Sequence, residues 1–238
     1  MIETVPETGS TNVDLAWRIR AGEEIPEGFW LRAEKQTGGR GRLGREWVSP
    51  EGNLYCSTVV EIFDADPPPH SLSFVASLAV YDTLEQCLKP NGKLLLKWPN
   101  DALVDGAKIS GILLERCVDS IVVGIGLNVS FSPELPDRKT TDILSENCEF
   151  DGGVEAVIET LAKCFSVRLT QWRGVGMSAT LDAWRGYSHA VGDELSATDA
   201  DGEKIIGTFA GISEVGALQL CLRDGTHTEI YAGDVNIV

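Results

Sequence analysis

The chain has few histidines and no cysteines at metal-binding spacing. Its 238 residues include three histidines and six cysteines. The cysteines form no Cys-x-x-Cys pair and are Cys56, Cys87, Cys117, Cys148, Cys164 and Cys221. Because zinc sites need close, paired ligands, we expect no metal ion held by the chain itself. Scattered cysteines in a chain without a signal peptide are typical of reduced thiols, so we expect a cytoplasmic protein.

The sequence also lacks a long apolar run and an excess of positive charge. No apolar stretch reaches the roughly 18 residues that a membrane-spanning helix needs, so we expect no membrane partner. Lys and Arg number 20 against 36 Asp and Glu, which gives a formal net charge of −16. Phosphate contacts dominate the affinity for nucleic acids, so this charge argues against DNA or RNA as a partner. A phosphate-bearing ligand would need a local group of basic residues.

Hydrophobic spacing predicts an α+β fold with a mixed sheet. Helical stripes are present at 13–19 (Val13, Ala16, Trp17 and Ile19), 72–87 and 154–172. Strand-like runs rich in β-branched and aromatic residues cover 29–34, 53–62, 93–98, 107–117 and 120–129. We expect Gly174 to stop the third helix and Asp105-Gly106 to form a hairpin turn.

The pattern changes after about Tyr187, where no helical stripe remains. Short alternating runs are separated there by Asp201-Gly202, by residues 214–216 and by Asp224-Gly225. They predict a small antiparallel β-barrel of roughly 50 residues, which is below the size that is comfortably stable alone. We therefore divide the chain into a larger domain (1–186) and a small β-barrel domain (187–238) that packs on it.

The first motif is a glycine- and arginine-rich loop. Residues 38–45 contain four glycines and three arginines, which disfavour both a stable helix and a packed strand. In a chain of net charge −16 this loop is where an anionic ligand would be bound, since the arginine fork suits phosphate and carboxylate oxygens. The alternative is a solvated surface loop. The loop has neither the Gly-Lys-Ser/Thr of a Walker A loop nor a dinucleotide-binding glycine pattern.

The second motif places a lysine in an apolar strand. Strict alternation puts Lys108 and Ser110 on one face and Ile109 and Gly111 on the other. A lysine there is costly to bury unless it meets an anion. The alternative is a lysine that reaches solvent from an edge strand. Asp101 lies across a hairpin and is close enough in sequence to approach Lys108.

Two further motifs are compatible with a ligand site. Gly124 and Gly126 lie inside a strand, which suggests close approach of a ligand or of backbone, and Asn128 follows them. The alternative is a bulge with a capping asparagine. Ser10-Thr11-Asn12 precedes the first helix and forms either its N-cap or, with Gln36, a polar holder for a small ring.

These stretches together, in this order and spacing, resemble the biotin–protein ligase family. They are S-T-N (10–12), E-K-Q-T-G-G-R-G-R-L-G-R-x-W (34–47), K-W-P-N-D (97–101), K-I-S-G-I-L-L-E (108–115) and G-I-G-L-N (124–128). The resemblance covers the whole chain, since bacterial members end in a small SH3-like β-barrel. It indicates the short class without an N-terminal winged helix-turn-helix, because the catalytic region begins within about ten residues of Met1.

The resemblance implies the catalytic fold of class II aminoacyl-tRNA synthetases and lipoate ligases. It also implies a reaction in two steps. The carboxylate of biotin attacks the α-phosphate of ATP, with Mg²⁺ on the phosphates, and gives biotinyl-5′-AMP and pyrophosphate. The biotinyl group then passes to a lysine of a biotin carboxyl carrier domain. A homodimer is compatible with the family but is not determined by the sequence.

The same resemblance assigns roles to individual residues. The catalytic residues would be Lys108, Arg40 and Asp101, with Asp101 facing the incoming lysine. The residues that bind biotin would be Ser10, Thr11, Asn12, Gln36, Arg40, Gly41, Arg42 and Lys108. The residues on the nucleotide side would be Arg42, Arg45, Trp47, Gly111, Gly126 and Asn128. The competing interpretations are a lipoate or octanoyl ligase on the same fold and a biotin-binding regulator without catalysis.

Overall fold

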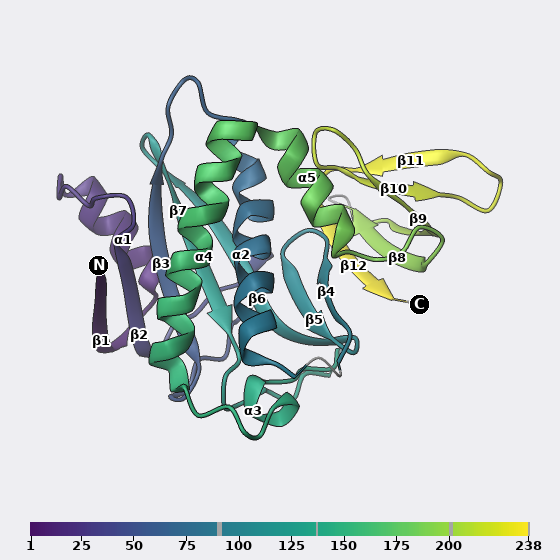
Figure 1. Cartoon of the computed structure of the whole chain (residues 1–238). Helices are drawn as coiled ribbons and strands as arrows, with labels where there is room; N and C mark the ends of the chain where they lie inside the picture. The colour runs from purple at the N-terminus through teal and green to yellow at the C-terminus, as the bar shows by residue number, and fades with distance from the viewer. Residues whose placement is uncertain (90–91, 137, 200–201, 238) are drawn as a thin grey trace.

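The computed structural model describes the chain except for residues 90–91, 137, 200–201 and 238. The described residues form a large sheet, helices on both of its faces and a smaller C-terminal sheet (Figure 1). The large sheet has the order β1-β2-β3-β7-β6-β5-β4. Its strands are β1 (Ile2–Thr8), β2 (Trp30–Gln36), β3 (Leu54–Glu61), β4 (Leu94–Lys97), β5 (Asp101–Val104), β6 (Ala107–Cys117) and β7 (Ser120–Leu127).

The pairing confirms the predicted mixed sheet. β1 runs parallel to β2, and the other neighbours are antiparallel. The hairpin between β5 and β6 turns at Asp105 and Gly106, whose φ angles are 47° and 80°. Two strands were not predicted. β1 is a largely exposed edge strand with charged residues and Pro6, and β5 is only four residues long and follows Pro99 and Asn100, which are typical of a turn.

Two helices, α2 (Leu72–Cys87) and α4 (Gly153–Val175), cover one face of the sheet, and Figure 1 shows them side by side in front of the strands. The helix α5 (Met177–Gly186) packs on these two helices and on β9 of the C-terminal sheet (Lys204–Ile212). The prediction that Gly174 ends the third helix is wrong. Gly174 lies inside α4, and the helix ends at Val175, followed by the C-cap residue Gly176, whose positive φ of 95° glycine adopts readily. The short helices α3 (Ile143–Glu146) and α5 were not predicted.

The helix α1 (Thr11–Arg20) packs on the opposite face of the sheet. The predicted stripe is only partly its buried face: Ala16 is buried and Ile19 packs against the same cluster, whereas Val13 and Trp17 are exposed. The buried positions are Thr11, Asn12, Leu15 and Ala16. This face is polar at its N-terminal end because that end borders a cavity, whereas Leu15 and Ala16 pack in an apolar cluster on the sheet.

The C-terminal sheet packs against the larger part of the chain, as predicted. Its strands run antiparallel in the order β11-β10-β9-β8-β12. They are β8 (Glu194–Asp199), β9 (Lys204–Ile212), β10 (Leu218–Cys221), β11 (His227–Ile230) and β12 (Gly233–Ile237). Leu195 and Phe209 share one hydrophobic core with the helices of the large sheet, and the Trp98 Nε1–H donates to the Gly216 carbonyl oxygen at 3.0 Å. Within the described residues, no helix is long and apolar enough to cross a bilayer.

Candidate functional site

A cavity of about 270 Å³ lies on the α1 side of the large sheet. This volume is close to the lower end of the roughly 300–1,000 Å³ that is typical of small-molecule sites. All fourteen residues assigned to the site from the sequence line it. They are Ser10, Thr11, Asn12, Gln36, Arg40, Gly41, Arg42, Arg45, Trp47, Asp101, Lys108, Gly111, Gly126 and Asn128. The structure therefore brings together side chains from segments more than 100 residues apart.

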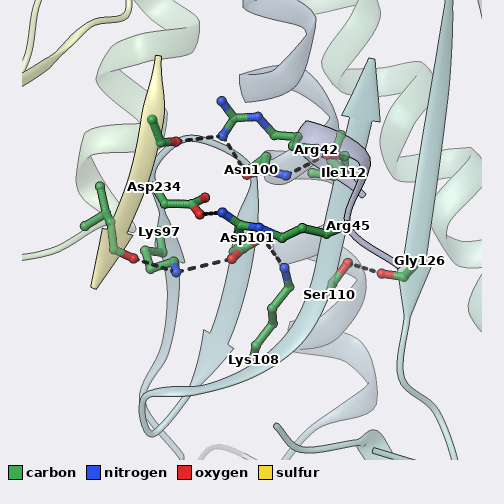
Figure 2. Close-up of polar contacts among 12 residues, drawn as sticks. Arg42, Arg45, Lys97, Asn100, Asp101, Lys108, Ser110, Ile112, Gly126 and Asp234 are labelled. Atoms are coloured by element: carbon green, nitrogen blue, oxygen red, sulfur yellow. Dashed lines mark hydrogen bonds and ion pairs between the residues drawn. The ribbon is translucent and has the colours of Figure 1, made fainter. Parts of the chain in front are cut away.

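Two lysines share one buried carboxylate at the floor of the cavity (Figure 2). Lys108 Nζ lies 2.6 Å from Asp101 Oδ1, and Lys97 Nζ lies 3.3 Å from Asp101 Oδ2. Burial by itself would raise the pKa of Asp101, but the two ammonium groups outweigh it and hold that pKa below its ordinary value. Asp101 is therefore ionised, whereas burial lowers the pKa of Lys97 from its ordinary value, with the Asp101 carboxylate as the main opposing influence.

A bulge in β6 turns Lys108 toward the cavity. Asp101 pairs with Gly111 and Leu103 pairs with Lys108, so β6 has one residue more than β5 between these pairs. The predicted strict alternation is therefore wrong, because an extra residue shifts the side chains that follow to the other face. Lys108 and Gly111 face the same side, and a Cβ at Gly111 would lie 3.2 Å from Lys108 Nζ. Ile109 points into the core instead.

The glycine- and arginine-rich loop closes the cavity from above and is attached to β12. Arg42 Nη1 donates to Asn100 Oδ1 at 3.3 Å and to the Gly233 carbonyl oxygen at 3.1 Å. Arg45 forms an ion pair with Asp234 (Figure 2). Burial lowers the pKa of Arg42 from its ordinary value. The short turn at Arg42–Gly44 was not predicted, because its residues show no helical periodicity. The contribution of Asp234 was not predicted either, because no residue pattern near it indicates a ligand site.

The indole of Trp47 lies flat over the two glycines of the strands below it. A Cβ at Gly126 would lie 2.7 Å from its Cζ2 atom, and one at Gly111 would lie 3.0 Å from its Cζ3 atom. Lys108 Nζ is 5.2 Å from a ring centroid of Trp47. The glycines were predicted to leave room for a ligand, and in this structure the indole lies there. Its Nε1–H is buried without a hydrogen-bond partner in the described part of the chain.

Polar side chains at the start of α1 form the opposite wall of the cavity. The Thr11 backbone N–H donates to Gln36 Oε1 at 2.9 Å, and Gln36 Nε2 donates to Ser49 Oγ at 3.2 Å. Ser10 is the N-cap residue of α1, but its side chain makes no capping hydrogen bond. Asn12 is bonded to Ser57 and Glu115, two residues that the sequence did not single out for the site.

Asn128 lies at the edge of the cavity and is buried. Its Nδ2 donates to the Thr141 carbonyl oxygen at 2.9 Å, and Asn53 Nδ2 lies 3.4 Å from its Oδ1. Asn53 in turn accepts from three consecutive backbone N–H groups, at 129–131, through its Oδ1. Asn128 therefore fixes the loop after β7, and its predicted role toward a nucleotide stays a prediction.

A mixed sheet thus carries a lysine–carboxylate cluster beneath an arginine loop, which is a site suited to a ligand with carboxylate or phosphate groups. A family model described as the biotin/lipoate A/B protein ligase family matches residues 9–132. The chain belongs to this family. It is 35% identical to a biotin–[acetyl-CoA-carboxylase] ligase of Mycobacterium tuberculosis, over 98% of this chain and 88% of that protein. It is also 35% identical to the ligase of that name from Paracoccus denitrificans, over 90% of this chain and 91% of the other.

Comparison with solved structures shows the same family likeness over the whole chain. A biotin protein ligase from Aquifex aeolicus, in complex with biotin and ATP, superimposes with a TM-score of 0.85 at 28% sequence identity. The superposition covers 100% of this chain and 99% of that chain. The α+β fold predicted from the sequence, with its C-terminal β-sheet, is therefore confirmed.

Proposed function

We propose that this chain is a biotin–protein ligase that activates biotin with ATP and transfers it to a lysine of a carboxyl carrier domain. One observation carries the proposal. A polar wall suited to a small ring, built around Asn12, lines the same cavity as the cation cluster around Lys108. The first surface fits the ureido ring of biotin, and the second fits its carboxylate and the α-phosphate of ATP. The relatives named above support the same substrates.

The first step forms the mixed anhydride. A carboxylate oxygen of biotin attacks the α-phosphorus, and the bond to the bridging oxygen of pyrophosphate breaks. Two anions approach each other in this step, so preorganised positive charge lowers the barrier most where negative charge accumulates. Lys108 supplies such a charge from the floor, and Arg40 and Arg42 supply it from the loop. Mg²⁺ on the phosphates of ATP would share this task.

The ureido ring of biotin has two N–H donors and one carbonyl acceptor. It therefore needs fixed acceptors and donors on the protein. Ser10, Thr11, Asn12 and Gln36 provide hydroxyl and amide groups on one wall of the cavity. Two of them, Thr11 and Gln36, are already bonded to each other, so the wall is preorganised before a ligand enters. The dithiolane ring of lipoate has no N–H or carbonyl groups and would leave these polar groups unpaired.

The second step transfers the biotinyl group to the ε-amine of the acceptor lysine, with AMP as the leaving group. Asp101 was expected to orient this amine or to take its proton. The pKa of Asp101 is lowered, which makes it a weak base. We therefore assign Asp101 to orienting the amine and not to taking its proton. The acceptor would be a biotin carboxyl carrier domain of a biotin-dependent carboxylase.

One assay separates this proposal from its alternatives. Purified protein is incubated with ATP, Mg²⁺, labelled biotin and a carrier domain, with lipoate and octanoate in parallel reactions. Transfer of biotin alone, with release of pyrophosphate, supports the proposal. Transfer of lipoate or octanoate but not of biotin would identify an acyl ligase of the other kind. Biotin binding without release of pyrophosphate would identify a binding protein without catalysis.

A further inference from the structure

The strongest unassigned feature of the cavity is the way in which Asn12 is held. Asn12 is only 4% exposed and lies over β7, between β3 and β6. Its Nδ2 donates to Glu115 Oε2 at 2.7 Å, and its Oδ1 accepts from Ser57 Oγ at 2.6 Å. Both ends of the amide are therefore fixed by side chains from different strands, and one of these side chains is charged.

We propose that Glu115 is a positioning residue that sets the hydrogen-bond polarity of the biotin-ring wall through Asn12 and Ser57. A glutamate carboxylate accepts hydrogen bonds and cannot donate them. The atom of Asn12 that faces Glu115 must therefore be the amide nitrogen. This orientation directs the Oδ1 atom of Asn12 toward Ser57, which must donate its only proton to that atom.

The same constraint extends one residue further along the wall. The hydroxyl oxygens of Thr11 and Ser57 are 2.7 Å apart. Because the Ser57 proton is committed to Asn12, the proton between these hydroxyls comes from Thr11. The Thr11 hydroxyl also lies 3.2 Å from Gln36 Oε1, but its single proton serves the shorter contact to Ser57, and Gln36 Oε1 accepts from the Thr11 backbone N–H instead. A single carboxylate thus orients three neutral groups, which are Asn12, Ser57 and Thr11. The chain of donors runs from Thr11 at the cavity wall to Glu115 on β6, and it leaves a lone pair of the Thr11 oxygen to accept from a ring N–H.

The sheet beneath Asn12 is shaped for this arrangement. Gly124 pairs with Ser57 on one side and with Leu113, two residues before Glu115, on the other. A Cβ at Gly124 would lie 2.8 Å from the Asn12 Cγ atom, which is closer than carbon atoms approach in real structures. Glycine at this position therefore gives the amide room to lie against β7, independently of the hydrogen bonds that orient it.

The decisive variant is Glu115→Gln, which keeps the size of the side chain and adds a donor. A glutamine accepts the reversed amide of Asn12 as well as the observed one, so the fixed polarity of the wall is lost. The proposal rests on the proposed function, since it names the residue that adapts this wall to biotin. The matched control is Glu61→Gln, which removes one charge at the exposed end of β3, away from the cavity.

The first measurement needs no ligand. In a two-dimensional ¹H–¹⁵N spectrum, the side-chain amide of Asn12, assigned with Asn12→Ala, should have one proton shifted strongly downfield by the carboxylate. This shift should disappear in Glu115→Gln and remain in Glu61→Gln. An Asn12 amide that is not shifted in the unmutated protein, or that is unchanged by Glu115→Gln, would overturn the proposal whatever the ligand is.

The second measurement compares affinities by calorimetry. Glu115→Gln should lower the affinity for biotin about 10- to 100-fold, which is the scale of a lost charge-assisted hydrogen bond. The affinity for ATP should not change. Its preference for biotin over 2-iminobiotin, in which nitrogen donors replace the ring carbonyl oxygen, should fall by a similar factor. Ser57→Ala should act in the same direction and combine with Glu115→Gln less than additively. An equal loss of affinity for biotin and for ATP would show a general structural role of Glu115 and would overturn the proposal.

The two proposals fail in different ways. If the unmutated protein binds no biotin, the proposed function is wrong and the assigned role of Glu115 is wrong with it, even where the Asn12 amide is shifted. If the unmutated protein binds biotin and folded Glu115→Gln binds it equally well, only the role of Glu115 is wrong. Thermal unfolding of each variant shows whether it is folded.

Discussion

Asp101 and Lys108 form a 2.6 Å ion pair at the floor of the cavity, and Lys97 approaches the same carboxylate from the other side. Asp101 is 5% exposed, so water contributes little to this cluster. The side chains of Lys97 and Lys108 are only 12% and 14% exposed, so the carboxylate of Asp101 supplies much of the compensating charge that water supplies at a surface. The ion pair fixes Lys108 Nζ at the point where a carboxylate and a phosphate would meet.

This relationship predicts a pH-dependent stability effect of Asp101→Asn. The substitution leaves two largely enclosed lysine side chains without their anion, so we expect a loss of about 3–5 kcal/mol in the free energy of unfolding at pH 7. The pKa of Asp101 is below its ordinary value, so its contribution is complete above about pH 4 and is lost as the pH falls through the folded-state pKa. Urea unfolding of both proteins between pH 7 and pH 3 measures the difference, which should shrink toward acid. A difference independent of pH would contradict this account.

Lys108 itself is expected to act on chemistry more than on binding. Lys108→Ala should lower the rate of adenylate formation by about 10²-fold or more, the scale for removing one donor that stabilises developing charge. The affinity for biotin should change much less, because the polar wall around Thr11 and Asn12 remains. Pyrophosphate release and calorimetric titration with biotin measure the two effects separately. Near-normal pyrophosphate release would show that the assignment to Lys108 is wrong.

The sequence predicted the cavity better than it predicted how the cavity is built. All of the residues assigned to the site line one cavity, because the motifs that carry the family resemblance can be recognised without a fold. The prediction that Lys108 and Gly111 lie on opposite faces of the sheet was wrong. It missed the bulge, because a bulge arises from the pairing of β6 with β5 and is not visible in the sequence of β6 alone. Glu115 ends the K-I-S-G-I-L-L-E motif, but no role was assigned to it, since its contact with Asn12 joins residues 103 positions apart. Asp234 lies 189 residues from Arg45, a distance over which local patterns give no signal.

The glycine- and arginine-rich loop should become more ordered when ligand binds. Residues 38–45 contain four glycines, and the loop is attached to β12 through Arg42 and Arg45. A biotinyl-adenylate beneath the loop would add contacts to the arginines, so amide exchange across 38–45 should slow when biotin and ATP are added. Hydrogen exchange followed by mass spectrometry measures this, with biotin alone as the comparison. Exchange in the loop that biotin plus ATP leaves unchanged would count against a lid.

A substitution at Arg42 should affect the retention of the biotinyl-adenylate intermediate more than its formation. A biotinyl-adenylate is an acylating agent, so the enzyme must keep it from water and from stray amines. Arg42 connects the loop to Asn100 and to Gly233, and Arg42→Gly removes both contacts together with one phosphate-pairing fork. The intermediate should still form because Lys108 remains. Its release should be about 10- to 150-fold faster, which corresponds to the loss of one charge-assisted hydrogen bond of about 1.5–3 kcal/mol.

The released adenylate should then acylate exposed lysines on unrelated proteins. The variant is incubated with biotin, ATP and a bystander protein, and attached biotin is detected on a blot beside the unmutated enzyme. A Leu43→Gly variant is the matched control, because Leu43 lies in the same turn with its side chain 79% exposed. This control should increase loop mobility without removing a cation, so it should label the bystander much less than Arg42→Gly does. Equal labelling by Arg42→Gly and the unmutated enzyme, with pyrophosphate still produced, would exclude Arg42 from the lid. Equal labelling by the two glycine variants would assign retention to loop stiffness and not to the charge of Arg42.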